Sequence, residues 1–105
     1  MAQIKWTESA LADLDDIANF IALDKPSAAK KLVREVFKSV SHLKKFPQSG
    51  RRPPELKGMS YREVIIGPCR VFYRVEKNKI YILYVMRAER ELRKFLLEDR
   101  DHESS

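Results

Sequence analysis

The spacing of apolar residues predicts a helical hairpin near the start of the chain. In residues 8–21 the apolar side chains recur every three or four positions, as on one face of an α-helix, and the aspartates fall on the opposite face. Thr7 stands where a hydroxyl would cap the free N–H groups of that helix. A second helical period runs over residues 26–46, with lysines and arginines opposite its apolar face. Because only a few residues separate the two periods, we expect the helices to pack side by side.

A different pattern follows a loop rich in proline and glycine. Residues 61–66, 69–76 and 79–86 are rich in β-branched and aromatic side chains, which is typical of strands joined by short turns. Residues 3–6 predict a fourth strand that pairs with the last of these, and residues 88–97 have the character of a final helix. The predicted fold class is α+β, with an N-terminal helical hairpin packed on a four-stranded, mainly antiparallel sheet and a C-terminal helix.

Two-residue turns would assign every strand residue to one face of the sheet, because side chains alternate along a strand. One face is apolar and would pack on the hairpin, whereas the other interleaves arginines with apolar residues. We expect the terminal helix or a partner chain to cover this second face. The residues predicted to face the hairpin are Val64, Ile66, Cys69, Val71, Tyr73, Val75, Ile80, Ile82, Tyr84 and Met86, and those predicted on the opposite face are Tyr61, Glu63, Ile65, Arg70, Phe72, Arg74, Tyr81, Leu83, Val85 and Arg87.

The length of 105 residues fits one domain, which we place at residues 1–97, and the acidic residues 98–105 are predicted to be a disordered tail. The single cysteine cannot form an internal disulfide, and the chain does not begin like a signal peptide. No apolar run approaches the roughly 20 residues that span a bilayer. We therefore expect a cytoplasmic protein with no membrane partner.

Charge is distributed unevenly along the chain, whose formal net charge is +6. Residues 8–24 carry five acids and no base, whereas residues 25–54 carry nine bases and one acid. Such a basic excess favours an acidic partner.

The sequence offers little for catalysis. Cys69 is predicted to be buried without a nearby base, and His42 and His102 lack the spacing of a metal site. With three glycines the chain has no phosphate-binding loop. We expect no catalytic residue, no metal and no cofactor. Arginine cannot act as a base at neutral pH but clamps phosphates and carboxylates, so the predicted target-binding residues are Arg62, Arg70, Arg74, Arg87, Arg90 and Arg93.

Three segments stand out when they are read in order: WTESALADLDDIANFIA, HLKKFPQSGRRPPEL and YREVIIGPCRVFYRVEKNKIYILYVMRAERELR. They cover most of residues 4–93. Their order, and the combination of an FPxxGR loop with an RVFYRV strand and a following aliphatic strand, resemble the RelE/ParE superfamily of bacterial toxins, and most closely its ParE branch. The resemblance implies a toxin of a type II toxin–antitoxin system with the α+β fold described above.

Two activities occur in this superfamily. RelE-like members cleave messenger RNA in the ribosome with several basic residues and a tyrosine, and Arg62, Arg70 and Arg90 stand at three of the basic positions. Val64, however, replaces a lysine, and Leu96 stands where the tyrosine would be. ParE-like members resemble this chain in lacking an acid–base set and are associated with the poisoning of DNA gyrase. The resemblance therefore implies a toxin that inhibits gyrase, and so DNA replication, by binding.

Two alternatives stay open: a ribosome-dependent mRNA endoribonuclease of RelE type, and a scaffold that assembles a repressor with its antitoxin. The partners implied are a cognate antitoxin of ribbon-helix-helix type, DNA gyrase as target, and operator DNA only through the antitoxin complex. We expect an acidic and apolar antitoxin segment to lie across the hairpin and the sheet. Its predicted contacts are Phe20, Phe72, Tyr81 and Leu83.

Overall fold

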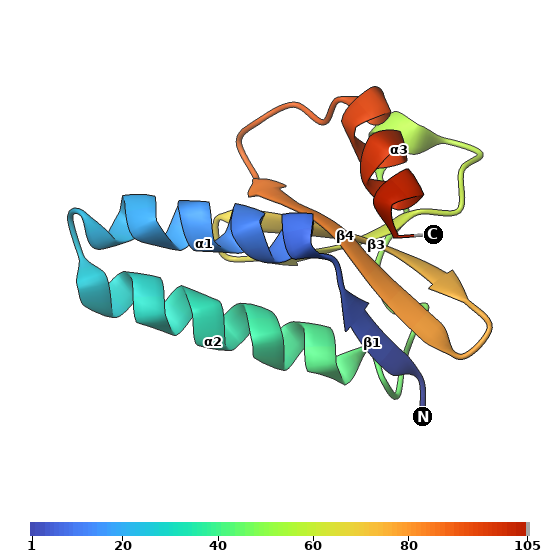
Figure 1. The fold of residues 1–105 in the computed structure, drawn as a ribbon, viewed down its shortest axis with the longest axis horizontal. Coiled ribbons are helices and arrows are strands. Elements are labelled where there is room, and N and C mark those ends of the chain that lie inside the picture. The colour runs from blue at the N-terminus through green and yellow to red at the C-terminus, as the bar shows by residue number, and fades with distance from the viewer. Residues whose placement is uncertain (105) are drawn as a thin grey trace.

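The computed structural model describes residues 1–104 and has the predicted α+β architecture (Figure 1). The sheet has the order β1-β4-β3-β2, in which β1 runs parallel to β4 and the other neighbours are antiparallel. Among these residues no helix is long and apolar enough to cross a membrane. The elements in chain order are β1 (Gln3–Trp6), α1 (Glu8–Ala22), α2 (Pro26–His42), the 3-10 helix η1 (Pro54–Leu56), β2 (Arg62–Ile66), β3 (Cys69–Glu76), β4 (Lys79–Arg87) and α3 (Lys94–Glu103).

The helical hairpin of α1 and α2 packs on one face of the sheet, as predicted. The Thr7 hydroxyl accepts a hydrogen bond from the Ala10 N–H and donates one to the Ile82 carbonyl, at 3.1 and 3.0 Å, so it caps α1 and ties it to β4. Leu14 and Val36 are buried against the strands. Each such side chain contributes about 1.5–3 kcal/mol by leaving water, so the apolar periodicity fixes how the hairpin sits.

A bulge in β4 changes the predicted faces of the sheet. Tyr73 pairs with Ile82, but Phe72 pairs with Tyr84, which leaves Leu83 as an extra residue. Side-chain alternation therefore shifts by one beyond this point. Two residues predicted to face the hairpin, Tyr84 and Met86, pack instead in the cluster on the other face, and Val85 moves the opposite way into the hairpin core. The predicted turns were correct, but the extra residue lies in mid-strand, where turn length carries no information.

The C-terminal helix lies further along the chain than the sequence predicted. It spans Lys94–Glu103, whereas residues 88–97 were expected to be helical and residues 98–105 disordered. Residues 98–103 are thus helical, and Ser105 lies outside the described residues.

Contacts with distant parts of the chain explain the position of α3. Its Leu97 is fully buried in a second apolar cluster with Phe72 and Leu83. Arg100 forms an ion pair with Asp13, 87 positions earlier in the sequence. The helix therefore covers the sheet face that combines arginines with apolar residues, and its order depends on tertiary partners that local composition does not reveal.

The FPxxGR loop is fixed to the sheet through Tyr73. The Tyr73 hydroxyl accepts a hydrogen bond from the Gly50 N–H and donates one to the Pro47 carbonyl, both at 2.9 Å. A Cβ atom on Gly50 would lie 2.8 Å from the Glu63 carbonyl oxygen and would overlap the Tyr73 ring. Only glycine allows this close approach, which explains the glycine of the motif.

Candidate interaction surface

Arg70, a predicted target-binding residue, is enclosed by acidic side chains. Its side chain is 8% exposed and makes four N–H···O hydrogen bonds of 2.7 to 3.2 Å to Glu55 and Glu63. Glu63 is fully buried and also accepts a hydrogen bond from Arg51 Nε at 3.0 Å. The Nε, Nη1 and Nη2 atoms of Arg70 all donate to these carboxylates, so this arginine belongs to the interior of the domain.

The acidic neighbours shift the ionisation of this cluster. The hydrogen bond that Arg70 donates holds the pKa of Glu55 below its usual value, and the bonds that Glu55 and then Glu63 accept raise the pKa of Arg70. Both shifts favour the charged pair. Because Glu55 lies in η1, the cluster also fastens the long loop to β2 and β3.

Arg62 and Arg74 also make internal contacts. Arg62 donates a hydrogen bond to the Gly50 carbonyl at 2.8 Å. Arg74 is bound by Asp101 at 2.7 Å and by Glu76 at 2.6 Å, and its guanidinium lies over the Tyr81 ring. Three of the six predicted arginines are therefore occupied in holding the loop and α3.

The other three arginines lie near the free end of β4. The side chain of Arg87 is 39% exposed, and Arg90 and Arg93 are exposed in the segment before α3. The bulge turns Arg87 toward α1, where its guanidinium lies 5.0 Å from the Phe20 ring centroid. Within residues 1–104, Arg87 pairs with Glu89, and no ion pair engages Arg90 or Arg93.

Two of them, Arg87 and Arg90, border a groove of about 350 Å³ between α1 and the end of β4, which we call the α1–β4 groove. Asp16 and Phe20 line it from α1, and Arg87 and Arg90 line it from the other side. The groove thus joins residues from two predicted sets, because Phe20 was assigned to the antitoxin and the two arginines to the target. It combines an exposed aromatic ring, guanidinium groups and carboxylates, which suits a partner with charged and apolar side chains.

One ion pair beside this groove was not predicted from the sequence. Asp13 accepts two hydrogen bonds from Arg100, at 2.7 and 2.9 Å, and a third from the Val85 N–H at 3.1 Å. Arg100 also donates to the Leu83 carbonyl at 3.2 Å. The pair therefore satisfies backbone groups along the edge of β4 that β1 is too short to reach. The only signal in the sequence was an aspartate on a polar helix face.

The predicted antitoxin contacts are placed very differently. Phe20 is 57% exposed, and Tyr81 is half-buried beneath Arg74. Phe72 and Leu83 have no exposed surface because they are packed inside the second apolar cluster, to which α3 contributes Leu97. In this conformation they are core residues, so the prediction that a partner contacts them directly is not compatible with the fold.

A second pocket, of about 370 Å³, contains groups that could in principle transfer protons. It is lined by Tyr61, Arg74, Asp101 and His102, among others. Burial, and then the hydrogen bond to Asp101, raises the pKa of Tyr61 to about 12, so this hydroxyl stays protonated at neutral pH. Arg74 is already bound by two carboxylates, which would oppose a bound phosphate.

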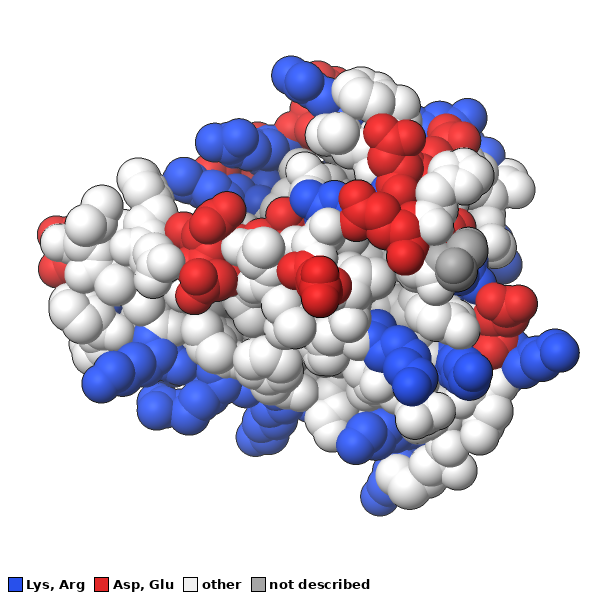
Figure 2. All heavy atoms as spheres, viewed as in Figure 1, with Lys and Arg blue, Asp and Glu red and all other residues white. Residues whose placement is uncertain are grey.

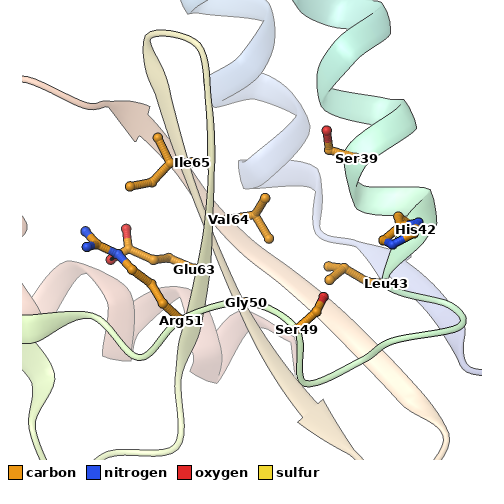
Figure 3. Close-up of a pocket in the computed structure, with 9 residues that line it drawn as sticks. All are labelled: Ser39, His42, Leu43, Ser49, Gly50, Arg51, Glu63, Val64 and Ile65. Carbon is orange, nitrogen blue, oxygen red and sulfur yellow. Dashed lines mark hydrogen bonds and ion pairs between the residues drawn. The ribbon is translucent and has the colours of Figure 1, made fainter.

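The pocket in Figure 3 brings no acid–base pair together either. It lies between α2 and β2 and has a volume of about 390 Å³. Glu63 points toward Arg51 on one side of β2, whereas His42 comes from α2 on the other side (Figure 3).

The single cysteine lies outside both pockets. Burial raises the pKa of the Cys69 thiol, which disfavours the nucleophilic thiolate.

The outer surfaces of the two hairpin helices carry opposite charge. Figure 2 shows acidic side chains over α1 and a row of basic side chains along α2. The groove with Phe20 lies on the α1 side, so the molecule presents two distinct charged surfaces to its surroundings.

A helical hairpin on a mixed four-stranded sheet, with an arginine-bordered groove at the end of β4, places this chain in the class of small α+β toxins. The solved structure of the chromosomal ParDE toxin–antitoxin system from P. aeruginosa matches it with a TM-score of 0.73 and 31% identity, over 85% of this chain and 98% of that chain. The toxin–antitoxin complex RelBE2 from Mycobacterium tuberculosis shares the fold, with a TM-score of 0.54 and 19% identity over 82% of this chain and 96% of that chain.

Comparisons of sequence identify the family. The sequence model of the family described as the ParE toxin of the type II toxin–antitoxin system parDE matches residues 4–92. Toxin RelE2 of Caulobacter vibrioides is 32% identical over 91 residues, which are 86% of this chain and 99% of the relative. This chain therefore belongs to the ParE toxin family, within the RelE/ParE superfamily, as its motifs predicted.

Proposed function

We propose that this toxin inhibits DNA gyrase by binding and not by catalysis, and that a cognate antitoxin neutralises it. The observation that carries the proposal is a set of arginines that are not enclosed in the domain: Arg87 and Arg90, which line the α1–β4 groove, and Arg93, which is exposed in the segment before α3. Guanidinium groups bind carboxylates and phosphates strongly, and gyrase holding DNA offers both.

A supercoiling assay tests the proposal directly. The purified toxin should inhibit supercoiling of relaxed plasmid by gyrase, and the triple variant R87Q/R90Q/R93Q should need at least about tenfold more protein for the same inhibition. A matched control is K57Q/K77Q/K94Q, which removes the same charge from exposed lysines outside the groove. The control should inhibit like the wild type. Absence of inhibition by the wild type at large molar excess would reject gyrase as the target.

We further propose that an antitoxin segment, from a partner of ribbon-helix-helix type, covers the hairpin end that carries Phe20. An exposed aromatic ring at a groove is the kind of anchor that contributes most to protein interfaces. Phe20→Ala should weaken antitoxin binding at least tenfold, which corresponds to the 1.4 kcal/mol typical of such an anchor. Phe46→Ala is the control, because Phe46 is 53% exposed and lies at the other end of the hairpin. Equal affinities for both variants would place the antitoxin elsewhere.

An mRNA endoribonuclease of RelE type is the alternative, and the similarity to toxin RelE2 favours it. Two of its three expected cations are engaged internally, since Arg62 binds the Gly50 carbonyl and Arg70 binds two carboxylates. Only Arg90 is free to meet a phosphate. Primer extension on cellular transcripts during expression decides the matter: cuts at ribosomal A sites would replace the gyrase proposal with this one.

A further inference from the structure

A row of cations along α2 is not explained by the groove or by the packing of the domain. It consists of exposed side chains on the face opposite the buried residues Leu32, Val36 and Val40. The helix has 17 residues and is therefore about 25 Å long at 1.5 Å per residue. We call this row the basic stripe; its members in α2 are Lys30, Lys31, Arg34 and Lys38, and Lys45 lies just beyond the end of the helix.

The stripe is almost free of compensating charge. Among the described residues its only ion pair joins Lys31 to Glu35, at 4.0 Å and with both side chains largely exposed. Lys30, Arg34 and Lys38 follow one another at four-residue intervals, so they repel along one helix face. Within residues 1–104 no ion pair engages any of these three side chains.

The start of α2 adds to this imbalance. Its first turn contains no acid, and Lys25 occupies the N-cap without a side-chain hydrogen bond to the helix. Positive charge there opposes the helix dipole. A helix under selection for stability alone would carry an acid or a capping hydroxyl at these positions, so the departures from local rules indicate that the charge serves an interaction.

The composition of the stripe favours a partner rich in phosphate groups. Protein interfaces depend on buried apolar anchors, and a membrane-binding helix inserts bulky apolar residues. The stripe has none of these between its cations; Phe37 lies at its flank and contacts the Trp6 ring. Instead, Ser27 and Ser41 are exposed among the basic side chains. Lysine, arginine and serine are the residue types that contact nucleic-acid phosphates.

The acids of α1 also favour a polyanion as the partner of α2. They lie on the other helix of the hairpin, as Figure 2 shows, and would be repelled by phosphates. The field of the molecule would therefore turn α2 toward a polyanion and α1 away from it. From these observations we infer that α2 itself contacts the phosphate backbone of duplex DNA. This goes beyond gyrase binding, and it departs from the expectation that DNA is reached only through the antitoxin.

The salt dependence of DNA binding reports how many phosphate contacts are made. Each phosphate contact contributes about −0.9 to the slope of log K against log salt concentration. Three contacts from Lys30, Arg34 and Lys38 would contribute about −2.7, so raising salt from about 50 to 200 mM would weaken wild-type binding about 40-fold more than that of a variant without them.

The experiment measures fluorescence anisotropy of a labelled mixed-sequence DNA duplex with the purified full chain, without gyrase or antitoxin. The variant K30Q/R34Q/K38Q should bind more weakly and with a slope shallower by about 0.9 for each lost contact. The control K57Q/K77Q/K94Q has the same net charge and should keep a slope near that of the wild type. Circular dichroism of each variant checks that the fold is retained.

Several outcomes would overturn the inference. Equal slopes for the wild type and the stripe variant would show that α2 makes no phosphate contacts, and equal losses in both variants would show a dependence on net charge alone. Binding of the same variants to vesicles that contain an anionic lipid is measured in parallel. If the stripe variant loses vesicle binding but keeps the DNA slope, the partner is a membrane surface and not DNA. Because gyrase is absent, none of these results bears on the proposed target.

Discussion

Replacing Arg70 with methionine tests whether this arginine belongs to the interior of the domain or to its binding surface. Methionine fills similar space with an apolar chain but offers no donor. The substitution removes four hydrogen bonds to Glu55 and Glu63. Glu55 is 33% exposed and can turn to water, whereas the side chain of Glu63 is fully buried and would keep only its bond from Arg51.

The loss should be large because a buried charge is left without its main partner. Breaking a buried ion pair on one side costs about 3–5 kcal/mol, which is a large part of the stability of a small domain. A loss of 3 kcal/mol lowers the melting temperature of a domain of this size by roughly 12 °C or more.

Urea unfolding followed by circular dichroism measures the effect. Arg90→Met is the control, since Arg90 is exposed and outside the described ion pairs, and its free energy of unfolding should stay within about 0.5 kcal/mol of the wild type. The double variant R70M/E63M removes both buried charges and should lose less than the sum of the two single variants, by about 0.5–3 kcal/mol. If R70M is as stable as R90M, Arg70 does not hold the loop and its assignment to the interior is wrong.

Three further predictions concern the loop and the sheet. Gly50→Ala should destabilise the fold by about 1–3 kcal/mol in urea unfolding, because the new methyl group meets the Tyr73 ring and the Glu63 carbonyl; an unchanged midpoint would show that the loop yields easily. The Cys69 thiol, fully buried and with a pKa raised by burial, should react with a thiol reagent only after unfolding, and rapid labelling of the native protein would contradict its placement. Because Arg70 lowers the pKa of Glu55, the stabilising contribution of Glu55 is present above the pKa of a free glutamate and is lost as pH falls through its lowered value. The stability difference between the wild type and Glu55→Gln should therefore shrink below about pH 4, and a constant difference would show that the ion pair is absent.

The candidate surface shows which part of a site can be predicted from residue type. The sequence identified six arginines by their chemistry, but exposure separates them into two groups. Arg70 and Arg74 stand in strands and face carboxylates from η1 and α3, whereas Arg90 lies in a connecting segment and faces solvent. Glu63 could be placed near Arg70 from the strand register, but Glu55 and Asp101 belong to other elements, and no pattern in the chain predicted that they reach these arginines.

The C-terminal segment illustrates the same limit. Residues 98–105 are acidic and polar, which is typical of a disordered tail. Leu97 and the pair of Arg100 with Asp13 nevertheless hold residues 94–103 in a helix on the sheet. A short helix of this kind gains its stability from tertiary contacts and not from its own propensity.

The order of the helices and strands, the hairpin, the two strand turns and the toxin family could all be predicted from the residues alone. These follow from local properties: the period of apolar residues, the capping hydroxyl of Thr7, and the turn at Gly67, whose φ of 53° suits glycine. Three features became visible only in the folded chain: the bulge at Leu83, the packing of α3 on the second apolar cluster, and which arginines remain exposed. Burial and ion pairing depend on residues that the fold brings together in space. Periodicity and turn chemistry depend only on residues that are neighbours in the sequence.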